Sequence, residues 1–257
     1  MSAILSIETS TLTASVALVK DGRVVLAKES GANTHSETLL SLVDECLHAG
    51  ELTLSELMTI AIGAGPGSFT GLRIGMATAK GLCFAADVSL TPVSSLAALA
   101  HDCLPHCEES SIIAAVLDAR RKEIFVGFFA REGSKLVSIG AEHVLAPKDL
   151  GELLGAELTD EQRARLVFCG DGASKYAEVL EGLAPFISQA GQTPTATAVA
   201  MLAYDLPAAE VLAQAKPTYV RLPEAEIKFP NGNTGGTFSA EGTASAASEK
   251  PRRKPGK

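Results

Sequence analysis

The chain has 257 residues, of which 46% are hydrophobic and 20% are charged. This is an ordinary globular composition, long enough for one large core or two smaller lobes, and it excludes a chain that is disordered throughout. The formal net charge is −8, although five of the 22 basic residues lie in the last eight positions. Because phosphate neutralisation supplies most non-specific affinity, such an acidic body is a poor independent binder of nucleic acid. If RNA is involved, we expect another subunit to contact it.

The sequence also bears on location and on metal binding. No apolar run approaches the ~18 residues of a membrane span, and the N-terminus lacks the pattern of a signal peptide. Five cysteines among apolar neighbours indicate reduced thiols rather than a disulfide framework. Cys103 and Cys107 lie beside two histidines, but their spacing matches no familiar zinc pattern. We therefore expect a soluble, cytoplasmic protein with no metal site and no membrane association.

The first part of the chain alternates strands and helices. Apolar runs predict strands at 3–8, 13–20, 23–29, 58–62 and 89–93. Helical periodicity predicts helices at about 36–50, 71–86 and 94–103. The helix at 71–86 is apolar on nearly every side, with only Arg73 and Lys80 charged. Such a helix must be covered on nearly every side, either as the central helix of its own domain or by a second chain on one face.

A second block begins near Ser111. Strands are predicted at 112–117, 123–130, 135–144 and 166–169, and helices at about 148–154, 174–183 and 195–214. The charged cluster Asp118–Glu123 lies between two of these strands. It is interpreted as a solvated hairpin loop, with a surface facing RNA or a partner as the alternative.

Both blocks place antiparallel strands before an alternation of helix and strand. This order fits an α/β fold of two ribonuclease H-like lobes, the arrangement of the actin, hexokinase and Hsp70 (ASKHA) superfamily. We expect an N-terminal lobe at 1–110, a C-terminal lobe at 111–223 and a disordered tail with a basic end at 224–257, where apolar content collapses.

The most informative segment is the glycine-rich stretch from Gly63 to Gly75, which joins a predicted strand to a predicted helix. Phosphates often bind at such turns, yet the glycine spacing fits neither a P-loop nor a dinucleotide fingerprint. The residues that would form an anion or nucleotide site are Glu8, Gly65, Gly67, Ser68, Gly71 and Arg73. The alternative is structural: the glycines allow tight packing and Glu8 caps the turn that follows the first strand, rather than binding a metal or water.

Two segments of the sequence are distinctive: Gly65-Pro66-Gly67-Ser68-Phe69-Thr70-Gly71-Leu72-Arg73-Ile74-Gly75, and the opening Ile7-Glu8-Thr9-Ser10 with Ala14-Ser15-Val16-Ala17-Leu18. Both closely resemble the bacterial TsaB (YeaZ) family, and the resemblance covers about residues 1 to 223. Pro217-Thr218-Tyr219-Val220-Arg221 is a weaker match. The resemblance implies the same two-lobed fold.

This resemblance implies a non-catalytic scaffold in the synthesis of N6-threonylcarbamoyladenosine, at the adenosine next to the tRNA anticodon. The expected partners are the TsaD transferase and, with it, the TsaE ATPase, and a homodimer would compete for the same surface. The chain would need no cofactor of its own, ATP being used by the complex, and tRNA would be bound only through the complex. In TsaD two histidines four residues apart bind the metal; here Leu39 follows His35 at that spacing.

The resemblance also places the partner surface on the two helices of the first lobe. The residues implied are Leu39, Leu40, Val43, Leu47, Leu72, Ile74, Met76 and Lys80, and periodicity leaves open which of them face the core. Nucleophilic catalysis is not expected, since the chain has no Gly-x-Ser-x-Gly elbow. Two alternative functions stay open: an ATPase or phosphotransferase of the same superfamily using Glu8 and the turn at Gly65–Gly71, and a nucleotide-binding regulator without turnover.

Overall fold

The computed structural model describes residues 2–30, 35–133, 135–187, 191–209 and 211–220. Contacts group Met1–Arg221 into one compact unit. The tail expected at 224–257 lies outside the described residues.

The first sheet has five strands. Its members are β1 (Ala3–Glu8), β2 (Ser15–Lys20), β3 (Arg23–Glu29), β4 (Thr59–Gly65) and β5 (Ser89–Ser94), in the order β3-β2-β1-β4-β5. β1 runs antiparallel to β2 and parallel to β4, which in turn pairs parallel with β5. β1 and β4 are buried along their whole length, as central strands covered on both faces must be.

The second sheet repeats the first four positions of this arrangement. It contains β6 (Ile112–Arg120), β7 (Glu123–Glu132), β8 (Lys135–Leu145) and β9 (Leu166–Cys169), in the order β8-β7-β6-β9. β6 is antiparallel to β7 and parallel to β9. Two sheets of this order confirm the expected α/β fold of two ribonuclease H-like lobes.

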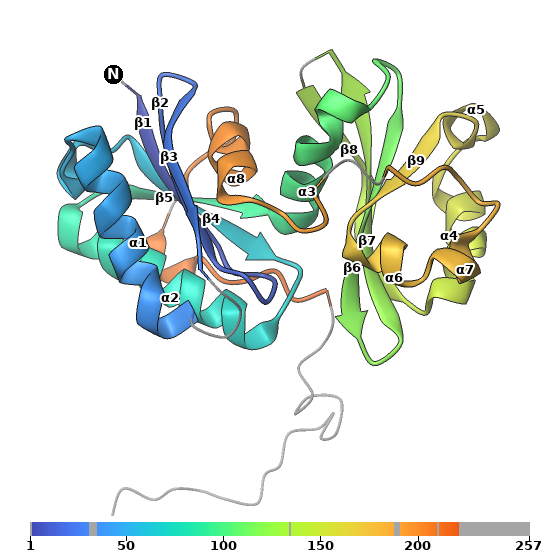
Figure 1. The fold of residues 1–257 in the computed structure, drawn as a ribbon, viewed down its shortest axis with the longest axis horizontal. Coiled ribbons are helices and arrows are strands. Elements are labelled where there is room, and N and C mark those ends of the chain that lie inside the picture. The colour runs from blue at the N-terminus through green and yellow to red at the C-terminus, as the bar shows by residue number, and fades with distance from the viewer. Residues whose placement is uncertain (1, 31–34, 134, 188–190, 210, 221–257) are drawn as a thin grey trace, which may run out of the picture. The chain divides into compact units, whose positions relative to one another are not determined.

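Helices cover both faces of the first sheet (Figure 1). α1 (His35–Gly50) and α2 (Phe69–Ala86) share one apolar cluster with β1, β2 and β4. The opposite face is covered by α8 (Ala196–Ala203), whose alanines and Val199 pack against Ile4 and Val19. A helix from the C-terminal part of the sequence therefore completes the core of the N-terminal sheet.

α3 (Ser95–Cys103) shows the opposite arrangement, a helix from the N-terminal part of the sequence that packs on the second sheet. It follows β5 of the first sheet directly, yet Leu96, Leu99 and Cys103 pack in the core of the second sheet. The other face of that sheet is covered by α4 (Leu150–Glu157) and by the segment that holds α6 (Asp171–Lys175) and α7 (Ala177–Leu180).

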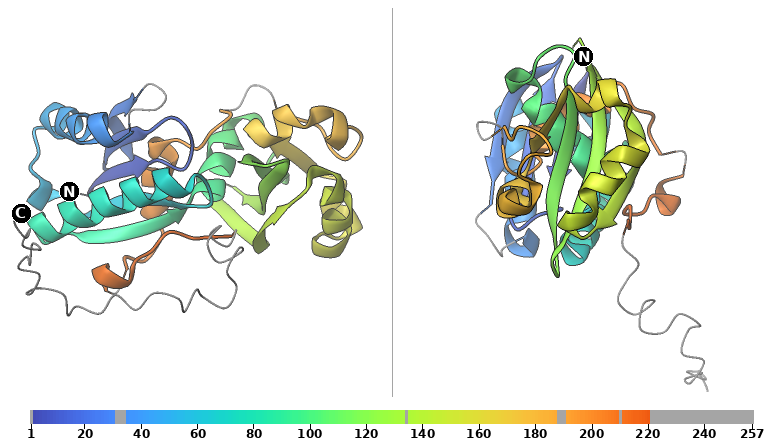
Figure 2. Two further views of the ribbon diagram at one scale, coloured as in Figure 1. Left: turned by 90° about the horizontal axis from the view of Figure 1, so that it is seen from below. Right: turned by 90° about the vertical axis from the view of Figure 1, so that its right-hand side faces the viewer.

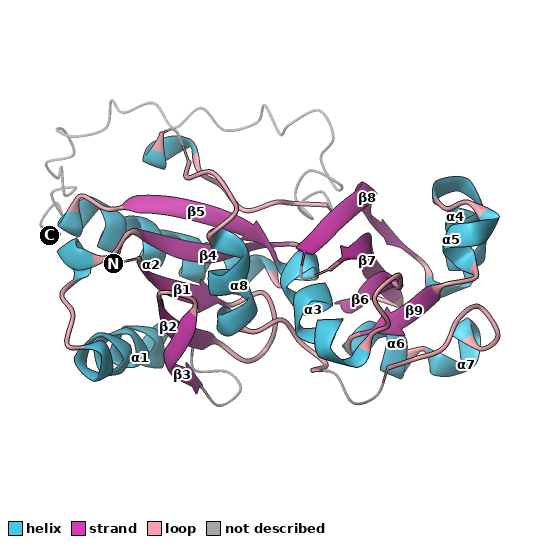
Figure 3. Ribbon diagram, turned by 90° about the horizontal axis from the view of Figure 1, so that it is seen from above, coloured by secondary structure: helices cyan, strands magenta, loops and turns pink. Residues whose placement is uncertain are grey.

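The exchanged helices α3 and α8 contact each other between the two sheets (Figure 3). Asp102 on α3 accepts hydrogen bonds from the backbone nitrogen and the hydroxyl of Thr195, both at 3.1 Å, and Thr195 is the N-cap of α8. Burial raises the pKa of Asp102 to about 6. A partly buried carboxyl group thus joins the helices that link the lobes.

Most predicted elements form within a few residues of their expected bounds, and the differences have local causes. The helix expected at 195–214 ends at Ala203, because Pro207 lacks the N–H that a continuing helix needs. The helix expected at 174–183 is divided into α6 and α7. The short helix α5 (Asp160–Arg163) was not predicted. Single 3-10 turns occur at Leu54–Glu56, Leu104–His106, Pro147–Asp149 and Leu212–Gln214.

Candidate functional site

The glycine-rich turn lies between β4 and α2, as its sequence predicts. Gly65 has a φ of 107°, a backbone conformation that glycine adopts without the strain of a side chain. Ser68 is the N-cap of α2, and its Oγ accepts a hydrogen bond from the Gly71 nitrogen at 3.3 Å. The residues that could form an anion site are thus brought to one strand-to-helix turn.

The space over this turn is filled by the chain itself. The Ser68 nitrogen donates to the Ser10 carbonyl at 2.7 Å, and the Thr9 hydroxyl donates to the Gly71 carbonyl at 2.9 Å. A Cβ atom on Gly67 would overlap Ser10, and one on Gly71 would overlap the Thr9 carbonyl. These glycines therefore allow the β1–β2 turn to lie directly against the start of α2.

Glu8 ends β1 beneath this turn and is only 1% exposed. One carboxylate oxygen accepts from the Ser10 nitrogen at 2.6 Å, and the other accepts from the Ser95 hydroxyl at 2.8 Å. The Ser95 hydroxyl in turn accepts from the Gly65 nitrogen at 3.3 Å. Burial raises the pKa of Glu8. The side chain joins β1, the glycine-rich turn and α3.

Arg73, on the second turn of α2, is held by the C-terminal segment of the described chain. Its Nε donates to the Tyr219 hydroxyl at 3.3 Å, and its guanidinium carbon lies 4.0 Å from the ring centre of Phe69. The rings of Phe69 and Tyr219 are themselves 5.2 Å apart. Arg73 thus takes part in an aromatic and cationic cluster at the start of α2.

The same C-terminal segment, residues 211–220, continues along the first lobe (Figure 2). The Lys80 ammonium group donates to the Ala213 carbonyl at 3.1 Å, and Leu212 packs against the core that α1 and α2 share. The Thr218 nitrogen donates to the Ala64 carbonyl at 2.7 Å. This segment therefore covers one side of α2, and both charged residues of that helix contact it.

Burial divides the residues implied as a partner surface into two sets. Leu39, Val43, Leu72 and Met76 are at most 4% exposed. Their side chains are buried within the chain itself, so the predicted partner surface is reduced to the residues of the two helices that are exposed or partly exposed. Leu40 is 60% exposed, and Leu47, Ile74 and Lys80 are partly exposed.

The solvent-exposed side of α1 and α2, here called the outer face, contains further residues that the sequence did not single out. Phe84 is 84% exposed near the end of α2, and Ala77 and Gly81 are exposed between it and Arg73. These four residues recur at helical spacing and so form one stripe on α2. Counting at helical spacing from the charged Arg73 could have identified this stripe. However, the α2 sequence is apolar on nearly every side, so the hydrophobic pattern did not indicate which side of the helix faces outward.

Among the described residues, no group of three or more His, Cys, Asp or Glu side chains is placed to hold a metal ion. None of the helices described is both long and apolar enough to cross a bilayer. The side chain of His35 lies outside the described set.

The chain is similar to proteins of one group. A family model described as tRNA N6-adenosine threonylcarbamoyltransferase (TsaD) matches residues 27–250. The Bacillus subtilis protein named tRNA threonylcarbamoyladenosine biosynthesis protein TsaB is 30% identical over 231 residues, which cover 88% of this chain and 97% of that protein. The Haemophilus influenzae protein of the same name is 37% identical over 129 residues, or 50% of this chain. That match spans about half the length of the Haemophilus protein, 54%.

Solved structures agree with the sequence matches. A Pseudomonas aeruginosa protein described as similar to peptidase YEAZ has a TM-score of 0.75 and 29% identity, covering 86% of this chain and 100% of that chain. A second structure, described as YeaZ from Pseudomonas aeruginosa, has a TM-score of 0.71 and 28% identity, covering 85% of this chain and 100% of that one.

Proposed function

The chain belongs to the TsaB (YeaZ) family, within the wider group that the TsaD model describes, and we propose that it acts in tRNA threonylcarbamoyladenosine biosynthesis as a non-catalytic scaffold. In this proposal it binds a TsaD-type transferase through the outer face of α1 and α2, and a TsaE-type ATPase joins the pair. The observation that carries the proposal is the exposed stripe on α2, whose apolar part is Ala77, Gly81 and Phe84 and in which Phe84 is 84% exposed.

The chemistry of this stripe suits a partner helix. When a partner buries an aromatic side chain that was exposed to water, the free energy of the complex is lowered. Such side chains are frequent anchors of interfaces. Ala77 and Gly81 lack bulky side chains, so another helix can approach α2 closely. On α1, Leu40 adds a second exposed apolar side chain to the same helical layer.

Two observations support a scaffold over an enzyme. Both carboxylate oxygens of Glu8 accept hydrogen bonds from the chain itself, and Thr9 and Ser10 fill the space over the glycine-rich turn. Leu39 stands where the second metal-binding histidine would be expected and is buried in the core. These contacts do not favour the alternatives of an ATPase or a nucleotide-binding regulator.

The direct test is formation of threonylcarbamoyladenosine on unmodified tRNA by TsaD, TsaE and threonylcarbamoyl-adenylate, with and without this chain. We expect product only when the chain is present, and no ATP hydrolysis by the chain alone. Product formation without the chain would contradict the scaffold role. Magnesium-dependent ATP hydrolysis by the chain alone would favour the ATPase.

The partner surface is tested by Phe84→Glu. We expect TsaD affinity to fall at least about 30-fold, because a buried aromatic anchor is lost and a charge replaces it. The far-ultraviolet circular dichroism of the variant should match that of the wild type, since Phe84 is exposed. Affinity is measured by titration calorimetry.

The matched control is Val179→Glu on α7, an exposed apolar residue of the second lobe that is 49% exposed. It should leave TsaD affinity unchanged. Met76→Glu, in contrast, should unfold the protein, because that side chain is 4% exposed and a buried unpaired charge is costly. Equal TsaD binding by wild type and Phe84→Glu would remove α2 from the interface.

A further inference from the structure

The turn between β6 and β7 in the second lobe carries three cationic residues in succession. Arg120, Arg121 and Lys122 are all exposed, and their φ angles are 62°, 53° and 63°. This left-handed conformation favours glycine or asparagine and is strained for other side chains. Turn geometry alone would therefore select different residues at these positions.

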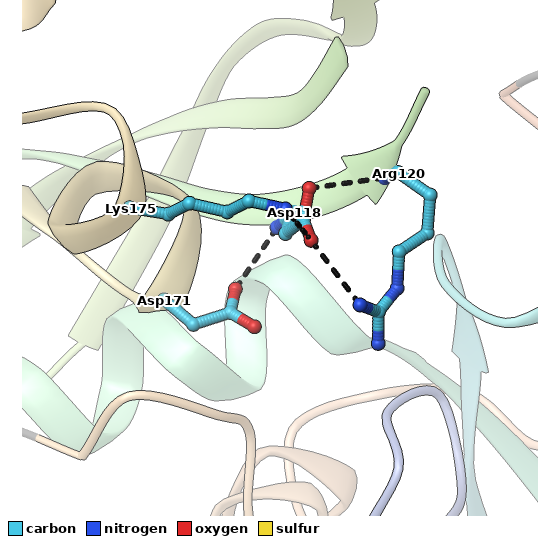
Figure 4. A network of polar contacts seen from close by, with 4 residues as sticks. All are labelled: Asp118, Arg120, Asp171 and Lys175. Atoms are coloured by element: carbon cyan, nitrogen blue, oxygen red, sulfur yellow. Dashed lines mark hydrogen bonds and ion pairs between the residues drawn. The ribbon is translucent and has the colours of Figure 1, made fainter. Parts of the chain in front are cut away.

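A fourth cation, Lys175, is held beside this turn by Asp118. The Oδ2 atom of Asp118 lies 2.7 Å from the Lys175 ammonium nitrogen and 3.6 Å from Nη1 of Arg120. Its Oδ1 accepts a hydrogen bond from the Arg120 nitrogen at 3.1 Å. Figure 4 shows Lys175 and Arg120 approaching Asp118 from opposite sides.

The exposure of these groups is unequal. The Asp118 side chain is 6% exposed, whereas those of Lys175 and Arg120 are 49% and 64% exposed. One buried carboxylate oxygen thus holds two cations that face water. Their joint positive charge exceeds what a single carboxylate neutralises.

A second carboxyl group lies under the same turn. Asp171 accepts a hydrogen bond from the Asp118 nitrogen at 2.9 Å. Burial raises the pKa of Asp171 and so disfavours its negative charge. The carboxyl groups fix the turn from beneath, and the cationic side chains are presented to solvent.

We propose that this cationic turn, made of Arg120, Arg121, Lys122 and Lys175, binds the phosphodiester backbone of RNA. The inference rests on the proposed function, which makes a tRNA the substrate of the assembly. The cationic turn would then supplement the RNA contacts of the other subunits and orient this chain on the substrate.

Charge complementarity favours an RNA backbone over an acidic protein. Phosphate oxygens accept hydrogen bonds from guanidinium and ammonium groups, and successive phosphates suit a row of fixed cations. The four cations outnumber the three carboxyl groups at this turn, which are Asp118, Glu123 and Asp171, so a local excess of positive charge can attract an anion although the chain has a net charge of −8.

The test is the double variant Arg121→Gly/Lys122→Gly. Glycine fits the positive φ angles of both positions, and this relief of backbone strain should offset the loss of the interaction that the Arg121 side chain makes, so the urea midpoint of unfolding should not fall. Fluorescently labelled tRNA is titrated with the full chain in the presence of its TsaD-type partner at several salt concentrations. We expect Kd to rise about 10-fold at low salt, and the slope of log K against log salt to shrink by about 1 to 2.

A matched control is Lys135→Gln/Lys148→Gln, which also removes two exposed positive charges from the second lobe. It should leave both Kd and the salt slope unchanged. If the glycine variant behaves like this control, the proposed RNA contact is wrong. If the glycine variant loses TsaD binding while tRNA affinity persists, the turn contacts protein and the proposal is also overturned.

Failure of the proposed function is read from separate measurements. Product formation by the wild-type mixture shows whether the chain is needed, and crosslinking of tRNA to the chain alone reports the contact. Product without the chain, combined with crosslinking that the glycine variant loses, would overturn only the scaffold role. A required chain whose glycine variant retains full tRNA affinity would overturn only the RNA contact.

Discussion

β1 and β6 hold the same position in their two sheets, and each has a carboxylate at or near its end. Both strands lie between an antiparallel and a parallel neighbour. Glu8 ends β1 among uncharged donors and is sealed inside the protein, whereas Asp118 near the end of β6 meets two half-exposed cations. The sheet topology therefore determines where the carboxylate lies. The side chains that contact it determine whether it is buried in an uncharged hydrogen-bond network, as Glu8 is, or lies beneath charged side chains on the surface, as Asp118 does.

The parallel neighbours of these strands show the same contrast. β4 leads through Gly65 and Gly67 into α2, a helix of 18 residues with an exposed stripe that ends in Phe84. β9 leads through Gly170 into α6, which has five residues and supplies Lys175 to the cationic turn. In our proposals the first lobe thus binds protein through a helix, and the second binds RNA through a turn.

The largest expected effect is on stability, and it should differ between substitutions of the two carboxylates. Glu8→Ala should lower the free energy of unfolding by about 3 to 4 kcal/mol, because it leaves buried donors of Ser10 and Ser95 without acceptors and opens a cavity. Asp118→Ala should cost only about 1 to 2 kcal/mol, since its half-exposed cations can be hydrated when the carboxylate is removed. Urea unfolding followed by circular dichroism measures both. Equal losses would show that the two sites are equally closed.

A smaller effect tests whether the glycines of the first lobe serve close packing. Gly71→Ala should destabilise the fold by about 2 to 3 kcal/mol, because its Cβ would overlap the rigid Thr9 carbonyl. Gly81→Ala in the same helix should stabilise by about 0.5 to 1 kcal/mol, since a Cβ there meets no atom within 4 Å. Thermal unfolding of both variants gives the comparison. A harmless Gly71→Ala would reopen the question of an open anion site.

The sequence predicted those features of the molecule that depend on local patterns. The bounds expected for β1, β3 and β9 agree with the structure, because short apolar or alternating runs between turn residues define them. The strand-to-helix turn at Gly65 was predicted for the same reason. The expected two-lobe fold followed from the order of these elements and from the family resemblance.

Contacts between distant segments could not be predicted in this way. Ser6 on β1 donates its hydroxyl hydrogen to the Ala196 carbonyl at 2.6 Å, and this contact belongs to the packing of α8 on the first sheet. Periodicity shows that α8 is apolar but not which sheet it covers. The same limit applies to α2, where only the tertiary structure separates the buried Met76 from the exposed Phe84.

The last prediction concerns the contact between α3 and α8, where Asp102 on α3 accepts hydrogen bonds from Thr195. Because burial raises the pKa of Asp102 from 3.8 to about 6, the folded state binds a proton more tightly than the unfolded state. This contribution to stability is fully present below pH 3.8 and is lost as the pH rises through about 6. Asp102→Asn keeps an acceptor for Thr195 without the charge, so the variant should be about 1 to 2 kcal/mol more stable than the wild type at pH 7.5, with no gain near pH 4. Urea unfolding at both pH values measures the difference, and Asp102→Ala, which removes the acceptor, should be destabilised at both. If the gain of Asp102→Asn were the same at both pH values, the titration of Asp102 would not contribute to the pH dependence of stability.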